Sequence, residues 1–190
     1  MIRIVPAQIP PGTALRTSRL ILRRQQVTDA AIFRQLWTER DDRVPPHRRI
    51  GPDGHPSVAD IAAHILEEQD STTPGLLTVQ RIDTGEVIGY CGVVFDGNGA
   101  PDEPELAFEL LQTVHNRGYA TEAGQAVLDW AAAAGYPRIW ASVWDWNLTS
   151  RRVLEKLGFV DSGVRRPPSE HGENLLTVRP FPPRSVSAVG

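Results

Sequence analysis

Two glutamates on one predicted strand offer the clearest acid–base chemistry in this sequence. The stretch ELAFELL, residues 105–111, is typical of a strand, and its period of two places Glu105, Ala107 and Glu109 on one face. A correctly placed carboxylate can take a proton from a reacting group, directly or through water. Glu105 is our first candidate for such a base and Glu109 the second. The alternative for each residue is an ordinary solvated strand face.

A glycine turn follows this strand and leads into a helix. The turn reads HNRGYA (115–120), and the alanine-rich helix after it is expected to end near Ala134, before Gly135. The first amides of a helix have no internal acceptors and carry the positive end of the helix dipole, so they bind anions. Gly118 permits a close approach, while Arg117 and Thr121 add a cation and a hydroxyl. The turn therefore suits a phosphate or diphosphate, although an ordinary turn has the same pattern.

A second polar element follows the next predicted strand. In NLTSRRVLEKLGF (147–159), Asn147 and Ser150 lie where the strand gives way to a helix. Asn and Ser are favoured near helix N-termini because their side chains accept hydrogen bonds from free amides. Helix capping and contact with a ligand are compatible functions for both side chains.

Together, the two elements resemble the GNAT acetyltransferase superfamily, and most closely its branch of ribosomal-protein N-terminal acetyltransferase-like enzymes. That family has a turn of the form Q/R-x-x-G-x-G/A after its fourth strand and N-x-x-S-x-x-V/L-x-x-x-G-F after its fifth. The matching residues here are His115 to Ala120 and then Asn147, Ser150, Val153, Gly158 and Phe159. The resemblance covers roughly residues 17–165. His115 departs from the usual Gln or Arg, which we do not interpret as loss of binding because backbone amides make most of the phosphate contact.

The resemblance implies an acetyl-CoA-dependent N-acetyltransferase that works by direct transfer in a ternary complex. It implies cofactor contacts from His115, Asn116, Arg117, Gly118, Tyr119, Ala120, Thr121, Asn147 and Ser150. Asn147 would hold the pantetheine arm, and Ser150 would also be the catalytic proton donor to the departing thiolate. The acceptor would be a primary amine, either a protein N-terminus or a small molecule. A catalytically idle acyl-CoA-binding or sensing module is the alternative.

Hydrophobic periodicity and turn signals predict the elements that position these residues. We expect strands at 19–24, 75–82, 86–95, 105–111 and 138–144, followed by one or two final strands. We expect helices at 29–39 and 149–157, a helix that begins at Ser57, and the helix after the glycine turn that ends near Ala134. This order predicts a single-domain α/β fold. From the resemblance, its mixed, mostly antiparallel central sheet is flanked by helices and splayed between the fourth and fifth strands. The domain spans 17–180, between an extended arm (1–16) and a flexible tail (181–190).

Several apolar patterns complete the expected core. In the helix that begins at Ser57, the apolar face comprises Val58, Ile61, Ala62, Ile65 and Leu66. Three tryptophans, Trp140, Trp144 and Trp146, share one side of the strand at 138–144, where core packing is the usual function. For Trp144 and Trp146 the alternative is a wall of the acceptor slot. Tyr119 is expected to pack under the glycine turn, and Cys91 to be a buried small hydrophobic residue.

Composition excludes several classes of function. The chain has 190 residues, a net charge of −3 and a pI of about 5.9, so it lacks the basic character of a nucleic-acid-binding protein. One cysteine excludes an internal disulfide, and the spacing of the five histidines predicts no metal site. No apolar run of membrane-spanning length or signal-peptide character is present, so we expect no membrane partner and a cytoplasmic location. A homodimer is compatible with the sequence.

Overall fold

A computed structural model describes residues 14–69, 75–95 and 103–182. Most of the predicted tail (183–190) and of the predicted arm (1–13) therefore lies outside the described residues. The strands are β1 (Leu15–Arg16), β2 (Leu20–Arg24), β3 (Leu76–Arg81), β4 (Val87–Val94), β5 (Glu105–Leu110), β6 (Arg138–Trp144), β7 (Val160–Asp161) and β8 (Asn174–Pro180). The helices are α1 (Ala30–Thr38), α2 (Val58–Glu68), α3 (Tyr119–Ala134) and α4 (Leu148–Lys156), with short 3-10 turns η1 (Val27–Asp29), η2 (Pro46–Arg48) and η3 (Gln112–Val114).

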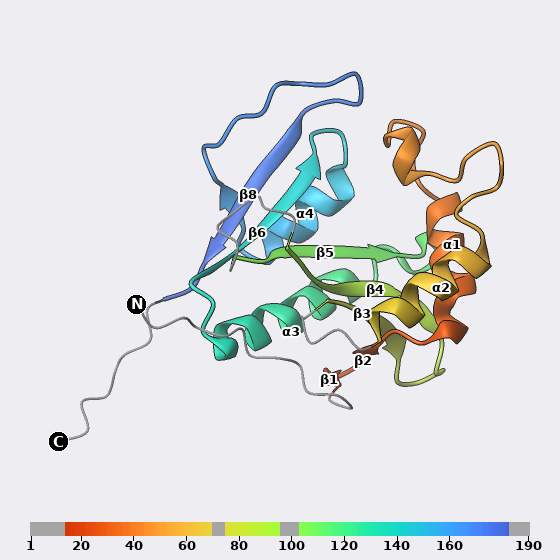
Figure 1. The fold of residues 1–190 in the computed structure, drawn as a ribbon. Coiled ribbons are helices and arrows are strands. Elements are labelled where there is room, and N and C mark those ends of the chain that lie inside the picture. The colour runs from red at the N-terminus through yellow and green to blue at the C-terminus, as the bar shows by residue number, and fades with distance from the viewer. Residues whose placement is uncertain (1–13, 70–74, 96–102, 183–190) are drawn as a thin grey trace.

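The strands form one sheet in the order β1-β2-β3-β4-β5-β6-β8-β7. Neighbouring strands are antiparallel except β5 and β6, which are parallel because α3 connects them. In Figure 1, β6 and β8 rise away from the rest of the sheet, α3 lies along β4 and β5, and α1 and α2 lie at the far end of those strands. The mixed, mostly antiparallel α/β fold expected from the sequence is confirmed.

The core is apolar and continuous between the sheet and its helices. Alternation in β2 buries Leu20 and Leu22 completely, and the buried face of α3 includes Val127 and Leu128. Cys91 in β4 is also buried, as predicted, and burial raises the pKa of its thiol to about 12. A neutral, enclosed thiol of this kind contributes packing and no nucleophile at neutral pH.

Helix signals in the sequence are confirmed at both kinds of terminus. Ser57 accepts a hydrogen bond from the Asp60 amide at 3.2 Å, and Asp60 accepts one from the Ser57 amide at 2.6 Å, which forms a capping box. Gly135 ends α3 in the left-handed region, at φ 90°. The apolar face predicted for α2 is too wide, because Val58 and Leu66, which it included, are 44% and 55% exposed. This helix packs against α1 at the margin of the domain, so only a narrow stripe of it is covered.

A buried ion pair joins β2, β3 and the start of α1. Asp29 is 2% exposed and accepts two hydrogen bonds from the Arg23 guanidinium, both at 2.8 Å. It also accepts one from Thr78 at 2.7 Å and one from the Gln26 amide at 2.9 Å. Burial alone would raise the pKa of this carboxyl, but the hydrogen bonds from Arg23 and Thr78 hold the pKa below its ordinary value.

Among the described residues, none of the helices is both long enough and apolar enough to span a membrane.

Candidate active site

Strands β5 and β6 diverge almost from the point where they begin. They share a single registered pair, Glu105 with Trp140, beside a hydrogen bond of 3.0 Å from the Trp140 amide to the Pro104 carbonyl. Beyond this pair, β6 leaves β5 at an angle (Figure 1). In folds of this kind, ligands bind beyond the carboxyl ends of adjacent parallel strands that separate in this way. We call the region between β5 and β6 beyond this pair the crevice. The splay predicted between the fourth and fifth strands is confirmed, since these are β5 and β6 once the short β1 is counted.

Glu105 lies at the point where the two strands part. Its side chain is buried, and Oε1 accepts a hydrogen bond of 2.9 Å from the Ser142 amide and a second from the Ser142 hydroxyl. The Glu105 carboxylate thus accepts the hydrogen bond of the Ser142 amide, which in a regular ladder would go to a main-chain carbonyl of β5. Ser142 was not among the predicted site residues. It lies between Trp140 and Trp144 on the same face of β6, and that position was a usable signal.

Glu109, the second candidate base, is held in an ion pair. Arg40 donates to both of its carboxylate oxygens, at 2.8 and 2.5 Å, and the Tyr90 hydroxyl donates to Oε2 at 2.7 Å. Burial and the nearby Glu109 carboxylate raise the pKa of the Tyr90 hydroxyl. Burial alone would lower the pKa of Arg40, but the hydrogen bonds and charge of Glu109 raise it. No sequence signal joins residues 40 and 109, so this pair could not be predicted.

The glycine turn has an unusual backbone. Asn116 and Gly118 both have positive φ angles, of 61° and 80°. The His115 ring Nε2 donates to the Leu110 carbonyl at 2.9 Å, which ties the start of the turn to the end of β5. Residues 115–118 are exposed, whereas Tyr119 is 8% exposed and packs beneath them, as expected. His115 therefore supports the backbone of the turn from the position where the family usually has Gln or Arg.

The start of α3 has the features of an anion site. Its N-cap residue is Gly118, and no side chain caps the helix. The first α3 amide with a main-chain acceptor in the described structure is that of Glu122, which donates to the Gly118 carbonyl at 3.0 Å. The amides of Tyr119, Ala120 and Thr121 precede it in the first turn, where a helix offers no acceptors. A diphosphate fits these residues, because free amides and the helix dipole act at a helix start that no side chain caps.

Asn147 caps α4 at the carboxyl end of β6. Its Oδ1 accepts a hydrogen bond from the Ser150 amide at 3.1 Å. Since β5 and β6 are parallel neighbours, α3 and α4 begin at the same edge of the sheet. The fold therefore brings Asn147, Ser150 and the glycine turn to one edge, as the sequence analysis requires. The capping function is confirmed, and the coenzyme contacts stay predictions.

An aromatic group lines the open end of the crevice. The rings of Trp144 and Trp146 are parallel at 6.4 Å between centroids, and the His171 ring meets Trp144 edge-on at the same separation. The Arg43 guanidinium lies 4.2 Å from the centroid of Trp146. All three tryptophans of this face are half-buried, so their placement in the core is wrong. Trp140 instead donates to Glu103 at 2.7 Å, at the closed end of the strands.

The Arg43–Trp146 contact brings the α1–α2 loop (39–57) over this end of the crevice. Arg40 also donates to the Arg48 carbonyl at 2.6 Å, so one guanidinium joins this loop to β5 through Glu109. In the upper right of Figure 1 the loop lies near the carboxyl end of β6 and the amino end of β8.

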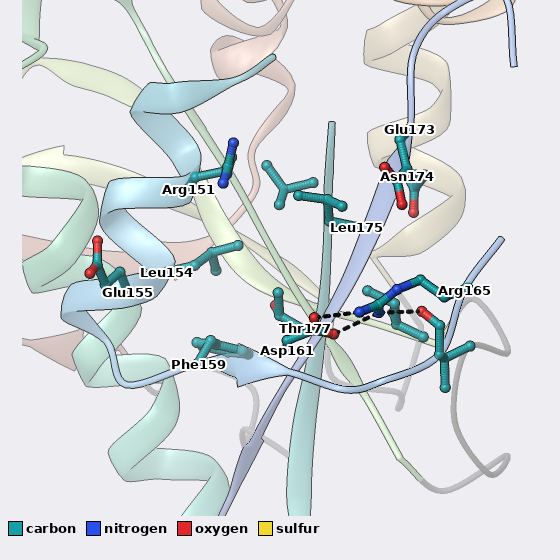
Figure 2. A pocket seen from close by; sticks show the side chains of 13 residues that line it. Arg151, Leu154, Glu155, Phe159, Asp161, Arg165, Glu173, Asn174, Leu175 and Thr177 are labelled. Carbon is teal, nitrogen blue, oxygen red and sulfur yellow. Dashed lines mark hydrogen bonds and ion pairs between the residues drawn. The ribbon is translucent and has the colours of Figure 1, made fainter. Parts of the chain in front are cut away.

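Two hollows lie outside the crevice. One, of about 900 Å³, follows α3 beside β1 and includes Gly118, Thr121 and Lys156 in its lining. The other, of about 210 Å³, lies between α4 and the β7–β8 edge (Figure 2). There, Arg165 pairs with Asp161 at 2.9 and 2.8 Å. The first hollow adjoins the start of α3, whereas the second contains none of the predicted site residues.

Comparisons with known proteins agree with this geometry. The family model for the acetyltransferase (GNAT) domain matches residues 19–160. The uncharacterised N-acetyltransferase p20 of Bacillus licheniformis is 29% identical over 171 residues, which are 88% of this chain and 93% of that protein. The crystal structure of an acetyltransferase from Agrobacterium tumefaciens has a TM-score of 0.67 and 29% identity, with 88% of this chain and 94% of the other covered.

A third similar protein is the ribosomal-protein-S5-alanine acetyltransferase of Vibrio fischeri. Its structure has a TM-score of 0.66 and covers 88% of this chain and 96% of its own. At 18% identity, this similarity concerns the fold alone. Since the family model spans both β5–α3 and β6–α4, the chain belongs to the GNAT acetyltransferase family and is an acyltransferase that uses acetyl-CoA.

Proposed function

We propose that this enzyme transfers the acetyl group of acetyl-CoA directly to a primary amine bound in the β5–β6 crevice. The amine nitrogen attacks the thioester carbonyl, the carbon–sulfur bond breaks, the nitrogen loses a proton and the thiolate gains one. The observation that carries this proposal is the parting of β5 and β6 from Glu105 onward, together with the uncapped start of α3 beyond the carboxyl end of β5. This juxtaposition supports a diphosphate at the helix and an acyl group between the strands.

Glu105 is the base in this proposal, and Ser150 is the donor to the thiolate. Glu105 faces the crevice from its closed end, and Ser142 orients it through two hydrogen bonds to Oε1. Glu109 is the weaker candidate, because three donated hydrogen bonds already engage its oxygens.

The acceptor that best suits these carboxylates is an amine that is easily deprotonated. An α-amine titrates near 7.7–8.0 and a lysine amine near 10.4, so an α-amine needs far less help from a base. The name of the Vibrio fischeri enzyme makes protein N-termini the first acceptors to test, with small-molecule amines beside them. Trp144, Trp146 and Arg43 supply an aromatic and cationic wall for that acceptor.

One observation favours a second function, that of an idle acyl-CoA-binding module. Both glutamates of the crevice face already accept hydrogen bonds within the protein. Such a module would bind CoA and leave the thioester intact.

Thioester consumption separates the two functions. We would measure it with N-terminal peptides and small amines, and measure CoA binding by calorimetry, for the wild type and for Glu105→Gln. General bases contribute about 10²–10⁴-fold to rate, so we expect Glu105→Gln to lose at least about a hundredfold in kcat with unchanged CoA binding. CoA binding without turnover on any amine supports the idle module, and a wild type that does not bind CoA refutes both functions.

A further inference from the structure

Glu122, in the first turn of α3, holds the segment that precedes β2. Its Oε1 accepts hydrogen bonds from the Thr17 hydroxyl at 2.5 Å, the Ser18 hydroxyl at 3.1 Å and the Arg19 amide at 2.9 Å. Its Oε2 accepts one from Arg19 Nε at 2.6 Å, and Arg19 Nη2 lies at the same distance. Burial alone would raise the pKa of Glu122, but the hydrogen bonds from Thr17 and Arg19 hold the pKa below its ordinary value.

The Arg19 guanidinium reaches from this pair to the glycine turn. Its Nη1 donates to the Arg117 carbonyl at 3.0 Å, and its plane lies over the Tyr119 ring with 4.5 Å to the centroid. A Cβ built on Gly118 would lie 3.5 Å from Nη2, so the guanidinium is in van der Waals range of the turn itself. Arg19 therefore contacts the turn, the helix and the aromatic ring beneath them at once.

The contact with the Arg117 carbonyl fixes a peptide plane. In a trans peptide the carbonyl and the following N–H point in opposite directions. While Arg19 holds the Arg117 carbonyl toward itself, the Gly118 amide must point away from Arg19. Asn116 and Gly118 both have positive φ, and glycine tolerates several backbone conformations, so without this contact the plane is free to rotate. A rotated plane would present a carbonyl oxygen in place of a donor, and that oxygen would repel a phosphate.

Glu122 also bears on the charge of the helix start. A carboxylate in the first turn opposes the binding of an anion there, because it neutralises the positive end of the dipole. The Arg19 charge, 2.6 Å away, offsets it. The pair thus leaves the helix start attractive to anions while fixing the adjacent turn.

We propose that Arg19 is a positioning residue for the coenzyme diphosphate, held by Glu122 so that the Arg117–Gly118 peptide presents its amide to the ligand. This inference rests on the proposed function. Arg19 acts through the backbone of the turn, so its loss weakens coenzyme recognition and leaves the chemical step unchanged. Glu122 acts through Arg19, so the two substitutions are not additive.

The test compares two acetyl donors in the full-length protein. Acetyl-CoA has the diphosphate, whereas S-acetylpantetheine lacks it. Arg19→Lys keeps the charge but loses the planar fork that spans Glu122 and the Arg117 carbonyl. We expect the KM for acetyl-CoA to rise about tenfold, the size of one lost charge-assisted hydrogen bond, with kcat within about twofold. With S-acetylpantetheine, kcat/KM should change less than about twofold.

Glu122→Gln and the double variant test the link between the two residues. Glu122→Gln should raise the KM for acetyl-CoA in the same direction, and Arg19→Lys with Glu122→Gln should be no worse than Arg19→Lys alone. Arg165→Lys is the matched control, since Arg165 forms a similar bidentate pair with Asp161 away from the crevice and should leave both donors unaffected. Circular dichroism melting verifies that each variant is folded.

Three results would overturn the inference. The first is an unchanged KM for acetyl-CoA in a folded Arg19→Lys, with CoA binding by the wild type intact, which leaves the proposed function standing. The second is an equal loss with both donors, which would indicate a general structural effect. The third is a wild type that does not bind CoA, which refutes the proposed function and the positioning of its coenzyme together.

Discussion

The ion pair between Arg40 and Glu109 allows a quantitative test of how the crevice is held together. We predict that Arg40→Met destabilises the protein by about 3 kcal/mol. The side chains of Arg40 and Glu109 are 10% and 23% exposed, and two hydrogen bonds of 2.8 and 2.5 Å join them. Removing one partner of a buried pair costs about 3–5 kcal/mol, because the other charge stays buried without compensation.

Two features of the pair place the effect at the lower end of that range. Water reaches part of Glu109, and the Tyr90 hydroxyl still donates to it at 2.7 Å. The lost stacking of Arg40 on Trp37, at 4.1 Å from the ring centroid, adds about 0.5–1 kcal/mol, part of which the methionine side chain replaces. Urea unfolding followed by tryptophan fluorescence measures the change. With a slope near 2 kcal/mol per molar, the midpoint should fall by roughly 1.5 M.

A double-mutant cycle supplies the control and the refutation. Glu109→Gln combined with Arg40→Met should be less destabilised than the sum of the two single variants by about 2 kcal/mol, because neither charge is then left alone. Arg165→Met, which breaks an exposed pair with Asp161, should not measurably shift the midpoint. Additive single effects, or an Arg40→Met midpoint equal to that of the wild type, would refute the assignment of a coupled buried pair.

Four further predictions concern other parts of the molecule. Because the folded pKa of Asp29 is depressed, its contribution to stability is present above the unfolded value of about 3.9 and is lost as the pH falls through the folded pKa. Urea midpoints between pH 6 and 2.5 should therefore fall less steeply for Asp29→Asn than for the wild type, and parallel slopes would contradict this. Gly89→Ala should lose more than about 3 kcal/mol in the same urea assay, since its Cβ would lie 2.1 Å from the Glu109 carbonyl oxygen and β4 would have to leave β5; a wild-type midpoint would be inconsistent with this contact. Gly118→Ala should cost about 1–2 kcal/mol of stability, because alanine resists φ of 80°, and should raise the KM for acetyl-CoA. Unchanged values of both would exclude a left-handed turn. Trp146→Leu should raise the KM for the amine about two- to fivefold, because the contact with Arg43 is lost, and should leave the KM for acetyl-CoA unchanged. A rise confined to the KM for acetyl-CoA would refute the proposal that Trp146 contacts the acceptor.

Local signals in the sequence were sufficient for most of the fold. The strand pattern of β2, the start of α2 at Ser57 and the end of α3 before Gly135 each depend on neighbours within a few residues, and each is confirmed. The divergence of β5 and β6 came from resemblance to a family, since no local pattern encodes it. The prediction that the whole apolar face of α2 is buried was wrong, because periodicity shows which side of a helix is apolar but not how much of that side a neighbouring helix covers.

The candidate site was only partly predictable for the same reason. The free start of α3 and the Asn147 cap follow from residue types at short spacing. The partners of Glu109 and Glu122 come from segments 69 and 103 residues away, so they become visible only when the chain is folded. Ser142 lies between these cases, because strand parity places it beside the tryptophans although its bond to Glu105 spans two strands.

The Glu105 side chain ends the hydrogen-bonded ladder between β5 and β6, and the length of this side chain determines where the two strands separate. It takes the Ser142 amide at 2.9 Å, so the ladder between β5 and β6 stops there. A shorter aspartate could not reach that amide, so β5 and β6 could form one more main-chain hydrogen bond. The crevice would then start nearer the carboxyl ends of the strands and be shallower. The depth of the crevice therefore depends on a single side chain, so substitutions at position 105 should change which acceptors the crevice admits.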